Sequence, residues 1–180
     1  MTTILRQSEA VPASYPDTPS GLSTAAAALD PKFIWHRIET YIAYRWTERE
    51  VTWTVEGLGW WVPPLAPTTI TKTEIWRDDA WEDVTLSPAP LGGYCLPGCG
   101  PYRFTATVGD PEIDVPAAVL EAFRRLAEHM AAKSENPGAS SESITIGEIS
   151  TSIRRDASWM ASALQNSGAA DLLRPYRRAQ

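Results

Sequence analysis

The side chains most able to do chemistry in this chain are few and widely spaced. The two cysteines, Cys95 and Cys99, flank a Leu-Pro-Gly turn, and the two histidines are His36 and His129. A zinc site usually needs four ligands at ordered spacings, and these histidines lie far from the cysteines in sequence. We therefore expect no metal. A disulfide across the turn would close a very small loop and would be rare in a cytoplasm, so two free thiols are expected.

Nucleophilic or acid–base catalysis would need partners that the sequence does not supply. Motifs for binding phosphates or dinucleotides, and those of zinc proteases and serine hydrolases, are absent from the sequence. A Ser-His-Asp or Cys-His site would have to use His36 or His129, and both fall in helical patterns. Adjacent acids such as Asp78 and Asp79 are usually solvated. We predict no enzyme activity, no catalytic residue and no cofactor.

Tryptophan is the residue type that this chain uses in excess. Of its eight tryptophans, five fall within 29 positions, namely Trp53, Trp60, Trp61, Trp76 and Trp81. Packing between a sheet and helices explains two or three of them, and the others suit a protein interface or the stacking of sugar rings. Trp60 and Trp61 lie between glycines and prolines and are hard to bury internally. We take Trp60, Trp61, Trp76 and Trp81 as candidate interface residues.

The composition is that of an ordinary globular protein. The chain has 180 residues, of which 43% are hydrophobic and 21% are charged, which excludes a wholly disordered chain, a collagen-like fibre and a coiled-coil rod. No run approaches the length of a membrane span, about 18 apolar residues. Residues 1–11 have no apolar core and do not form a secretory signal. We expect a soluble protein made in a cytoplasm.

Charge is distributed unevenly along the chain. The net charge is −6, yet residues 153–180 hold five arginines and two aspartates, while the other 152 residues hold 11 basic and 20 acidic residues. A basic end on an acidic body often marks a docking segment. The alternative is a solvated C-terminus that happens to be basic. The acidic balance argues against a cationic nucleic-acid-binding protein, which needs a basic footprint.

Changes in the hydrophobic period predict the elements that would position these residues. A three- to four-residue period indicates helices, and a two-residue period indicates strands. Residues 1–20, rich in proline, are expected to be flexible. The predicted helices are 31–46, 115–133 and 156–165, and the predicted strands are 49–56, 69–76, 81–86 and 101–108.

This order of elements predicts an α+β fold. We expect the main helices to pack together, with a small antiparallel β insertion between them and an extended C-terminal docking segment. The predicted organisation is a flexible N-terminal arm with a possible short helix over residues 1–30, a main domain over 31–152 and the basic segment over 153–180. Fifteen prolines imply many loops and sheet edges.

Several short motifs, taken in order, resemble one family. The run Tyr-Arg-Phe-Thr-Ala-Thr-Val-Gly at 102–109 is followed by Asp-Val-Pro-Ala-Ala-Val at 114–119 and a helix. Arg-Ile-Glu-Thr-Tyr-Ile at 37–42 leads into a strand, Trp-Val-Pro-Pro-Leu-Ala-Pro occupies 61–67, and the chain closes on Leu-Leu-Arg-Pro-Tyr-Arg-Arg at 172–178. Over residues 31–178 the chain resembles the head–tail connector (adaptor) proteins of long-tailed phages and alphaproteobacterial gene transfer agents.

The resemblance implies a structural protein without a reaction. Such proteins form a twelvefold ring beneath the portal at the capsid vertex, with the next neck component, a stopper or tail-completion protein, below it. DNA passes through the lumen without sequence-specific binding, and no membrane is involved. The expected location is the head–tail junction of a virion or gene transfer agent particle, made in a bacterial cytoplasm.

The resemblance also assigns the C-terminal segment to portal docking. Leucine and tyrosine would supply apolar burial there, and arginine would supply charge pairing. The alternative is that Leu172, Leu173 and Tyr176 fold back on the helices of their own chain. The expected portal-docking residues are Leu172, Leu173, Arg174, Tyr176, Arg177 and Arg178.

Two other functions compete with a neck protein. The clustered tryptophans suggest a carbohydrate-binding module, in which indole faces would stack on sugar rings. A small hydrolase would have to use His36 or His129, and we expect no loss of activity when either is changed.

Overall fold

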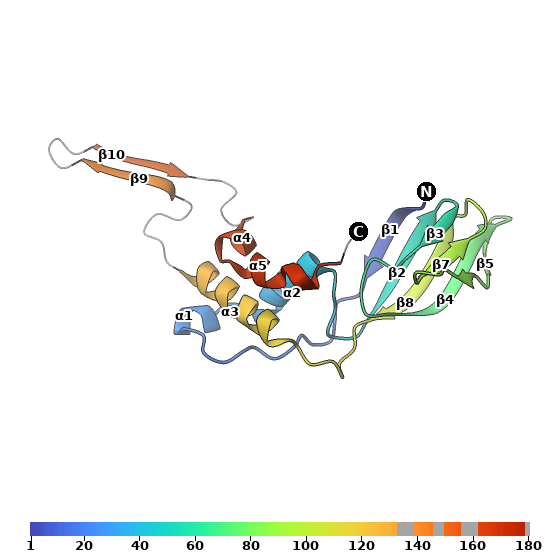
Figure 1. Ribbon diagram of the computed structural model, residues 1–180, viewed down its shortest axis with the longest axis horizontal. Helices are drawn as coiled ribbons and strands as arrows, with labels where there is room; N and C mark the ends of the chain where they lie inside the picture. Colours follow the sequence, from blue (N-terminus) through green and yellow to red (C-terminus); the bar gives the residue numbers. More distant parts are fainter. Residues whose placement is uncertain (133–138, 146–149, 156–161, 179–180) are drawn as a thin grey trace. The chain divides into compact units, whose positions relative to one another are not determined.

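The computed structural model describes residues 1–132, 139–145, 150–155 and 162–178. The chain forms two compact units, each built from segments that are distant in sequence (Figure 1). The first unit comprises Met1–Pro16, Glu39–Asp114 and Arg177–Gln180, and the second comprises Asp17–Ile38 and Val115–Tyr176. Helix α2 (Pro31–Ile42) contributes its last four residues to the first unit.

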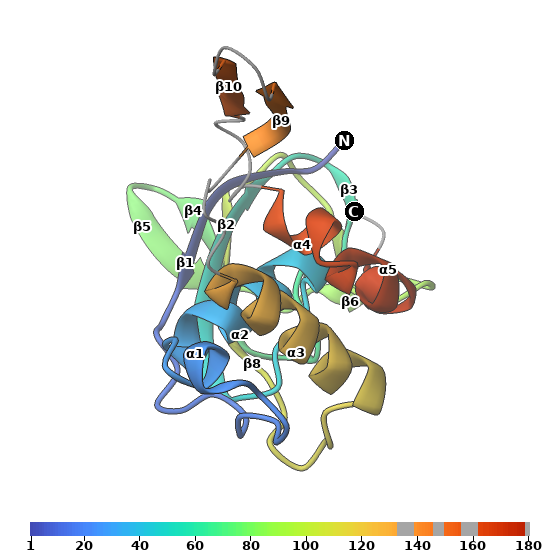
Figure 2. The ribbon, with the colours of Figure 1, turned by 90° about the vertical axis from the view of Figure 1, so that its left-hand side faces the viewer.

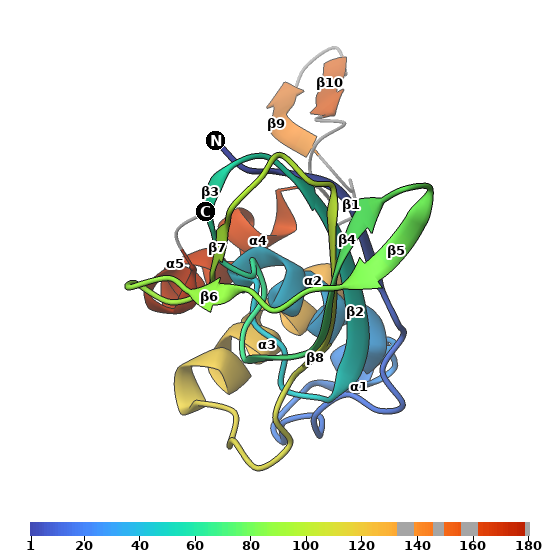
Figure 3. The ribbon, with the colours of Figure 1, turned by 90° about the vertical axis from the view of Figure 1, so that its right-hand side faces the viewer.

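Five antiparallel strands form the main sheet of the first unit, in the order β1-β2-β8-β4-β5. Along β2 and β8 every second side chain is buried, as the alternation in the sequence predicts. Figure 3 shows β4 and β5 as a hairpin at one side of this sheet. The strands are β1 (Thr3–Glu9), β2 (Arg49–Glu56), β4 (Thr68–Arg77), β5 (Ala80–Asp83) and β8 (Tyr102–Val108).

A second, smaller sheet of the first unit has the order β3-β7-β6. Its strands are β3 (Gly59–Trp61), β6 (Ser87–Pro88) and β7 (Tyr94–Leu96). They are short because proline has no N–H for a ladder hydrogen bond, and a proline ends or closely follows each of the three. Gly93, with a φ of 79°, brings the backbone before β7 against the Trp61 carbonyl group, where a Cβ has no room.

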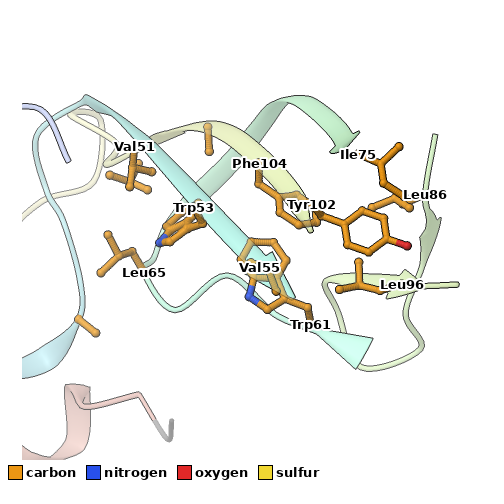
Figure 4. Packing of buried hydrophobic residues seen from close by; sticks show 13 residues of the cluster. Val51, Trp53, Val55, Trp61, Leu65, Ile75, Leu86, Leu96, Tyr102 and Phe104 are labelled. Atoms are coloured by element: carbon orange, nitrogen blue, oxygen red, sulfur yellow. The ribbon is translucent and has the colours of Figure 1, made fainter. Parts of the chain in front are cut away.

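Both sheets of the first unit contribute to one aromatic core (Figure 4). Trp61 of β3 stacks on Phe104 of β8 with ring centroids 4.0 Å apart, and its ring meets the edge of Trp53 at 5.7 Å. Val55, Leu96 and neighbouring apolar residues fill the remaining space. Burying a side chain of this size stabilises the folded state by roughly 1.5–3 kcal/mol, so packing between the two sheets contributes substantially to the stability of the first unit.

The second unit is mainly helical (Figure 2). Val119, Phe123 and Leu126 form the buried face of α3, and the Phe123 ring lies 4.9 Å from that of Trp35. Strands β9 (Ala139–Thr145) and β10 (Ser150–Arg155) pair only with each other. The helices are α1 (Thr24–Ala27), the first part of α2, α3 (Ala117–Ala131), α4 (Ala163–Asn166), α5 (Ala169–Leu173) and the 3-10 turn η1 (Arg174–Tyr176).

The predicted α+β architecture, with a small β insertion between packed main helices, is wrong. The structure is rich in antiparallel sheet, and most of its helices are short. Two causes account for the error. Strand β1 adds an edge to the main sheet from the N-terminal segment, and the short strands beside the prolines form a second sheet. The β region therefore encloses its own core.

The structure also describes parts of both ends of the chain. Residues 1–30, expected as a flexible arm with a possible short helix, contain β1 paired with β2, and α1. Thr3–Glu9 has no alternation of apolar and polar residues, so no sequence pattern marks it as a strand. The predicted helix at 156–165 lies largely outside the described residues, and the basic segment from 153 onward is shared between the two units.

A cluster of four charges fixes the end of β1 in the first unit. Glu9 accepts hydrogen bonds from Arg45 Nε at 2.6 Å and Nη2 at 3.0 Å. Arg49 Nη1 lies 2.9 Å from Glu39 Oε2, and its Nη2 donates to Glu39 Oε1 at 3.1 Å. Arg45, Arg49 and Glu39 are buried, while Glu9 is half-buried. The cluster joins β1, the last turn of α2 and the start of β2.

The two carboxyl groups of this cluster respond differently to their surroundings. Burial of Glu9 opposes its ionisation, but hydrogen bonds and charge from Arg45, together with Arg49, outweigh this and lower its pKa. Glu39 is fully buried, and burial raises its pKa despite the nearby Arg49 and Arg45. Arg49 is the main group that opposes this effect of burial on Glu39.

Removing one partner of a buried ion pair leaves an uncompensated charge. Arg49→Met is expected to lower the free energy of unfolding by about 3 kcal/mol, and adding Glu39→Gln to that variant should restore part of the loss. Urea denaturation at neutral pH measures both effects. Arg77→Met, which removes an exposed arginine of the same unit, is the control and should change stability by less than about 0.5 kcal/mol. Equal losses in the two arginine variants would contradict this role of the cluster.

Candidate protein-interaction site

An open groove of about 540 Å³ lies beside edge strand β1 of the first unit. Ile4 and Gln7 of β1 line one part, residues 61–64 line another, and Arg178 completes it. Both strands that contribute, β1 and β3, are at the edge of their sheet. The groove is therefore the open side of the space between two sheets. We refer to it below as the edge groove.

The sequence Trp-Trp-Val-Pro-Pro at 60–64 explains one wall of the edge groove. Alternation along β3 buries Trp61, which is 4% exposed, and turns Trp60 outward, where it is 58% exposed. Pro63 and Pro64 then end the strand because they cannot donate ladder hydrogen bonds. Val62 stays exposed beside them, so this wall presents apolar surface to solvent.

Arg178 is held against the proline-rich wall by backbone oxygens. Its Nη1 donates to the carbonyl oxygens of Pro63, at 3.2 Å, and Leu65, at 2.8 Å, and its backbone N lies 3.5 Å from the Ile42 oxygen. Its Nε and Nη2 make no hydrogen bond within the described part of the chain. The hydrogen bonds of Nη1 thus fix the position of the guanidinium group, while its Nε and Nη2 can donate to an acceptor on another molecule.

The charge of the edge groove is opposite to that of its unit. The three segments of the first unit hold 8 basic and 13 acidic residues, yet among the described residues Arg178 lines the groove and no Asp or Glu does. A second groove of about 390 Å³ shares Val62, Pro63 and Arg178 with the edge groove. Leu91, which is 85% exposed, borders this second groove.

A second surface of the first unit lies on the β4–β5 hairpin. Trp76 and Trp81 pair across the hairpin with ring centroids 5.3 Å apart and planes at 65°. The Arg103 guanidinium lies 4.4 Å from the Trp81 ring centroid and donates to both oxygens of Glu74, at 2.6 and 2.7 Å. The turn at Asp78 and Asp79 has positive φ at both residues, as the tight hairpin turn requires.

The ionised form of Glu74 is strongly favoured. The hydrogen bonds from Arg103 outweigh the effect of burial and, with the hydrogen bond from Lys72 at 2.8 Å, lower the pKa of Glu74 to about 2. Glu74 itself is buried, while Arg103 and Lys72 are partly exposed. The hairpin therefore carries a rigid ion network beneath its two indoles.

The four tryptophans predicted as interface residues occupy three different environments. Trp60 is exposed beside the edge groove, and Trp61 is buried in the core and lines that groove. Trp76, exposed, and Trp81, half-buried, belong to the hairpin. Trp60 and Trp61 thus lie on opposite faces of β3, while Trp76 and Trp81 lie together on the hairpin.

The predicted portal-docking segment is divided between the two units. In the second unit Leu173 is fully buried, Leu172 and Tyr176 are half-buried, and Arg174 is exposed. In the first unit the exposed Arg177 guanidinium lies 4.8 Å from the Tyr41 ring centroid, and Arg178 lines the edge groove. Ile4 and Gln7 were not anticipated in any site, because β1 lacks an alternating pattern.

The cysteines and histidines that the sequence offered for chemistry lie in different units. Within those residues no three or more His, Cys, Asp or Glu side chains gather to hold a metal ion. Cys95 and Cys99 both carry free thiols. His36 and His129 belong to the second unit. Among the described helices, none is long and apolar enough to cross a membrane.

No protein-family model, no curated protein and no solved structure matches this chain. A functional proposal therefore depends on the sequence motifs and on the geometry of the structure.

Glu74 gives a pH-dependent test of the hairpin network. Its pKa is near 4.5 in an unfolded chain and about 2 in the folded one, so its stabilising effect is complete above pH 4.5 and is lost as the pH falls toward 2. At pH 6, Glu74→Gln should lower the free energy of unfolding by about 2 kcal/mol. Denaturant titrations should show this difference shrinking between pH 4.5 and pH 2, because other acids titrate equally in both proteins. A difference that stays constant with pH would contradict the network.

Proposed function

We propose that this protein is a structural subunit of the neck of a tailed phage or gene transfer agent particle. In this proposal identical copies form a ring between the capsid portal and the next neck component, and DNA passes through the lumen. The ordered motifs at 37–42, 61–67, 102–109 and 172–178 supply the resemblance to head–tail adaptors. The expected copy number of twelve comes from that resemblance alone.

The apolar surface around the edge groove is the observation that supports assembly. Ile4 and Leu5 of edge strand β1 are exposed, as are Trp60 and Val62 of the opposite wall. An open sheet edge with apolar side chains favours pairing with other chains, and soluble monomers usually cover or charge such an edge. A neighbouring subunit would bury this surface.

The distribution of charge agrees with a conduit for DNA. The first unit carries more acidic than basic residues, and an acidic lining does not hold sliding phosphates as a cationic lining does. The exposed Arg174 and Arg177 remain available for charge pairing with a portal. Leu173 is buried in its own unit, so docking through it would require that turn to open.

The geometry of the tryptophans favours a protein interface over a carbohydrate site. Sugar stacking uses an open, flat indole face. Arg103 lies against Trp81, and Trp76 meets Trp81 at 65°, so the pair presents no shared flat surface. Arginine beside tryptophan is instead a common composition of protein–protein hot spots.

Assembly is testable by native mass spectrometry of the purified chain, alone and with its portal. We expect a closed multimer of one defined copy number, and Val62→Asp should reduce its fraction at least tenfold because it places a carboxylate on the apolar wall. Val11→Asp is the matched control, since Val11 is exposed in the same unit away from the groove. A monomer with no affinity for portal would contradict the proposed function.

Glycan binding is tested by tryptophan fluorescence. Titration of the chain with a panel of oligosaccharides should leave the emission unchanged, because the paired indoles of Trp76 and Trp81 present no open, shared flat face. Saturable quenching by one glycan, lost in Trp76→Ala, would favour the carbohydrate-binding alternative.

A further inference from the structure

The polar atoms available in the edge groove are hydrogen-bond donors. Nε and Nη2 of Arg178 and the side-chain amide nitrogen of Gln7 have no acceptor within the described residues, while Gln7 Oε1 is occupied by Trp53 Nε1 at 2.9 Å. Trp61 Nε1 is buried, and it too has no hydrogen-bond partner in the described part of the chain. The donors of Arg178 and Gln7 that lack an acceptor therefore favour a ligand that carries acceptor groups.

The walls of the edge groove are apolar and the groove is open to solvent. Ile4 lies on one side, and Val62, Pro63 and Pro64 lie on the other. A ligand that matches this surface carries an apolar side chain together with carboxylate groups, because Arg178 prefers an anionic acceptor. The first unit carries more acidic than basic residues, and Arg178 is the charged side chain among the described residues that line the groove, so Arg178 is the group that would attract such a ligand.

The chain itself carries one exposed segment with this chemistry. Ile113 is 41% exposed and stands between Glu112 and Asp114, both exposed and both without an ion-pair partner among the described residues. Among the exposed large apolar residues of the described chain, Ile113 alone has a carboxylate on each side. Asp110 shapes this segment by accepting hydrogen bonds from the backbone of Glu112, at 3.0 Å, and Ile113, at 3.3 Å.

We propose that the edge groove of one copy receives the Glu112-Ile113-Asp114 segment of a neighbouring copy. Ile113 would pack between Ile4 and Val62, and one flanking carboxylate would pair with the unoccupied side of Arg178. The inference rests on the proposed ring function and names its subunit contact. The groove and the segment are different patches of the same unit, so the contact is head-to-tail, the type that closes rings.

The groove's recognition can be tested without assembly. A capped peptide with the sequence of residues 109–115 is titrated into the ¹⁵N-labelled full-length chain while the indole N–H resonances are followed. We expect a saturable shift of the Trp61 resonance, assigned by its loss in Trp61→Phe, and at least tenfold weaker binding to Arg178→Gln. A peptide with Gln, Ala and Asn in place of Glu112, Ile113 and Asp114 should bind at least tenfold more weakly. No shift at millimolar peptide would overturn the inference.

Charge exchange tests the contact between copies. Arg178→Glu should lower the multimer fraction in native mass spectrometry at least tenfold, as should the double variant Glu112→Arg/Asp114→Arg. Mixing the two variant chains should restore assembly. The groove made acidic in one variant would then meet the segment made basic in the other. Glu82→Arg/Asp83→Arg, on exposed acids of the hairpin, is the matched control and should assemble normally. Circular dichroism verifies folding of each variant.

The outcomes separate the inference from the function on which it rests. If Arg178→Glu assembles as well as the unchanged chain, the named contact is wrong while the ring proposal stands. If the unchanged chain never assembles, even with portal, the ring proposal fails. Peptide binding in that case would still support recognition of the acidic segment by the groove.

Discussion

The placement of strand β1 depends on a few charged groups rather than on apolar burial. The side chains of Thr3–Glu9 are almost all exposed, so little hydrophobic energy holds this strand against β2. Its end is instead fixed by Glu9, which Arg45 and Arg49 bind beside the buried Glu39. Buried ion pairs often add little net stability, but they specify geometry. Here they specify which segment becomes the sheet edge, and hence one wall of the edge groove.

The groove and the proposed assembly follow from this geometry. Two sheets close around an aromatic core yet remain open where β1 and β3 are both edge strands. Among the described residues, the open side is lined mainly by apolar side chains, contains donors without acceptors, and has Arg178 as its charged side chain. In the proposed assembly, an adjacent copy with an acidic, apolar loop would satisfy these groups. The same physical features would therefore account for both the proposed assembly and its head-to-tail contact.

The sequence predicted those elements whose side chains alternate or repeat strongly. The pattern at 49–56 matches β2 (Arg49–Glu56), and the long apolar stripe of α3 was also anticipated. Strand β1 was missed because its stability comes from backbone pairing and from Glu9, neither of which leaves a local pattern. The predicted tryptophans include Trp60 and Trp61 of the groove, but not Ile4 or Gln7. The C-terminal arginines were singled out for docking to the portal, whereas Arg178 contacts the carbonyl groups of its own chain.

An electron cryomicroscopy reconstruction of the neck of assembled particles tests the central claim most directly. The account predicts that this chain forms a closed ring below the portal, with density from residues 112–114 of each subunit in the edge groove of the next. A neck that lacks this chain, or a ring in which the groove faces solvent and Arg178 contacts no neighbour, would contradict it.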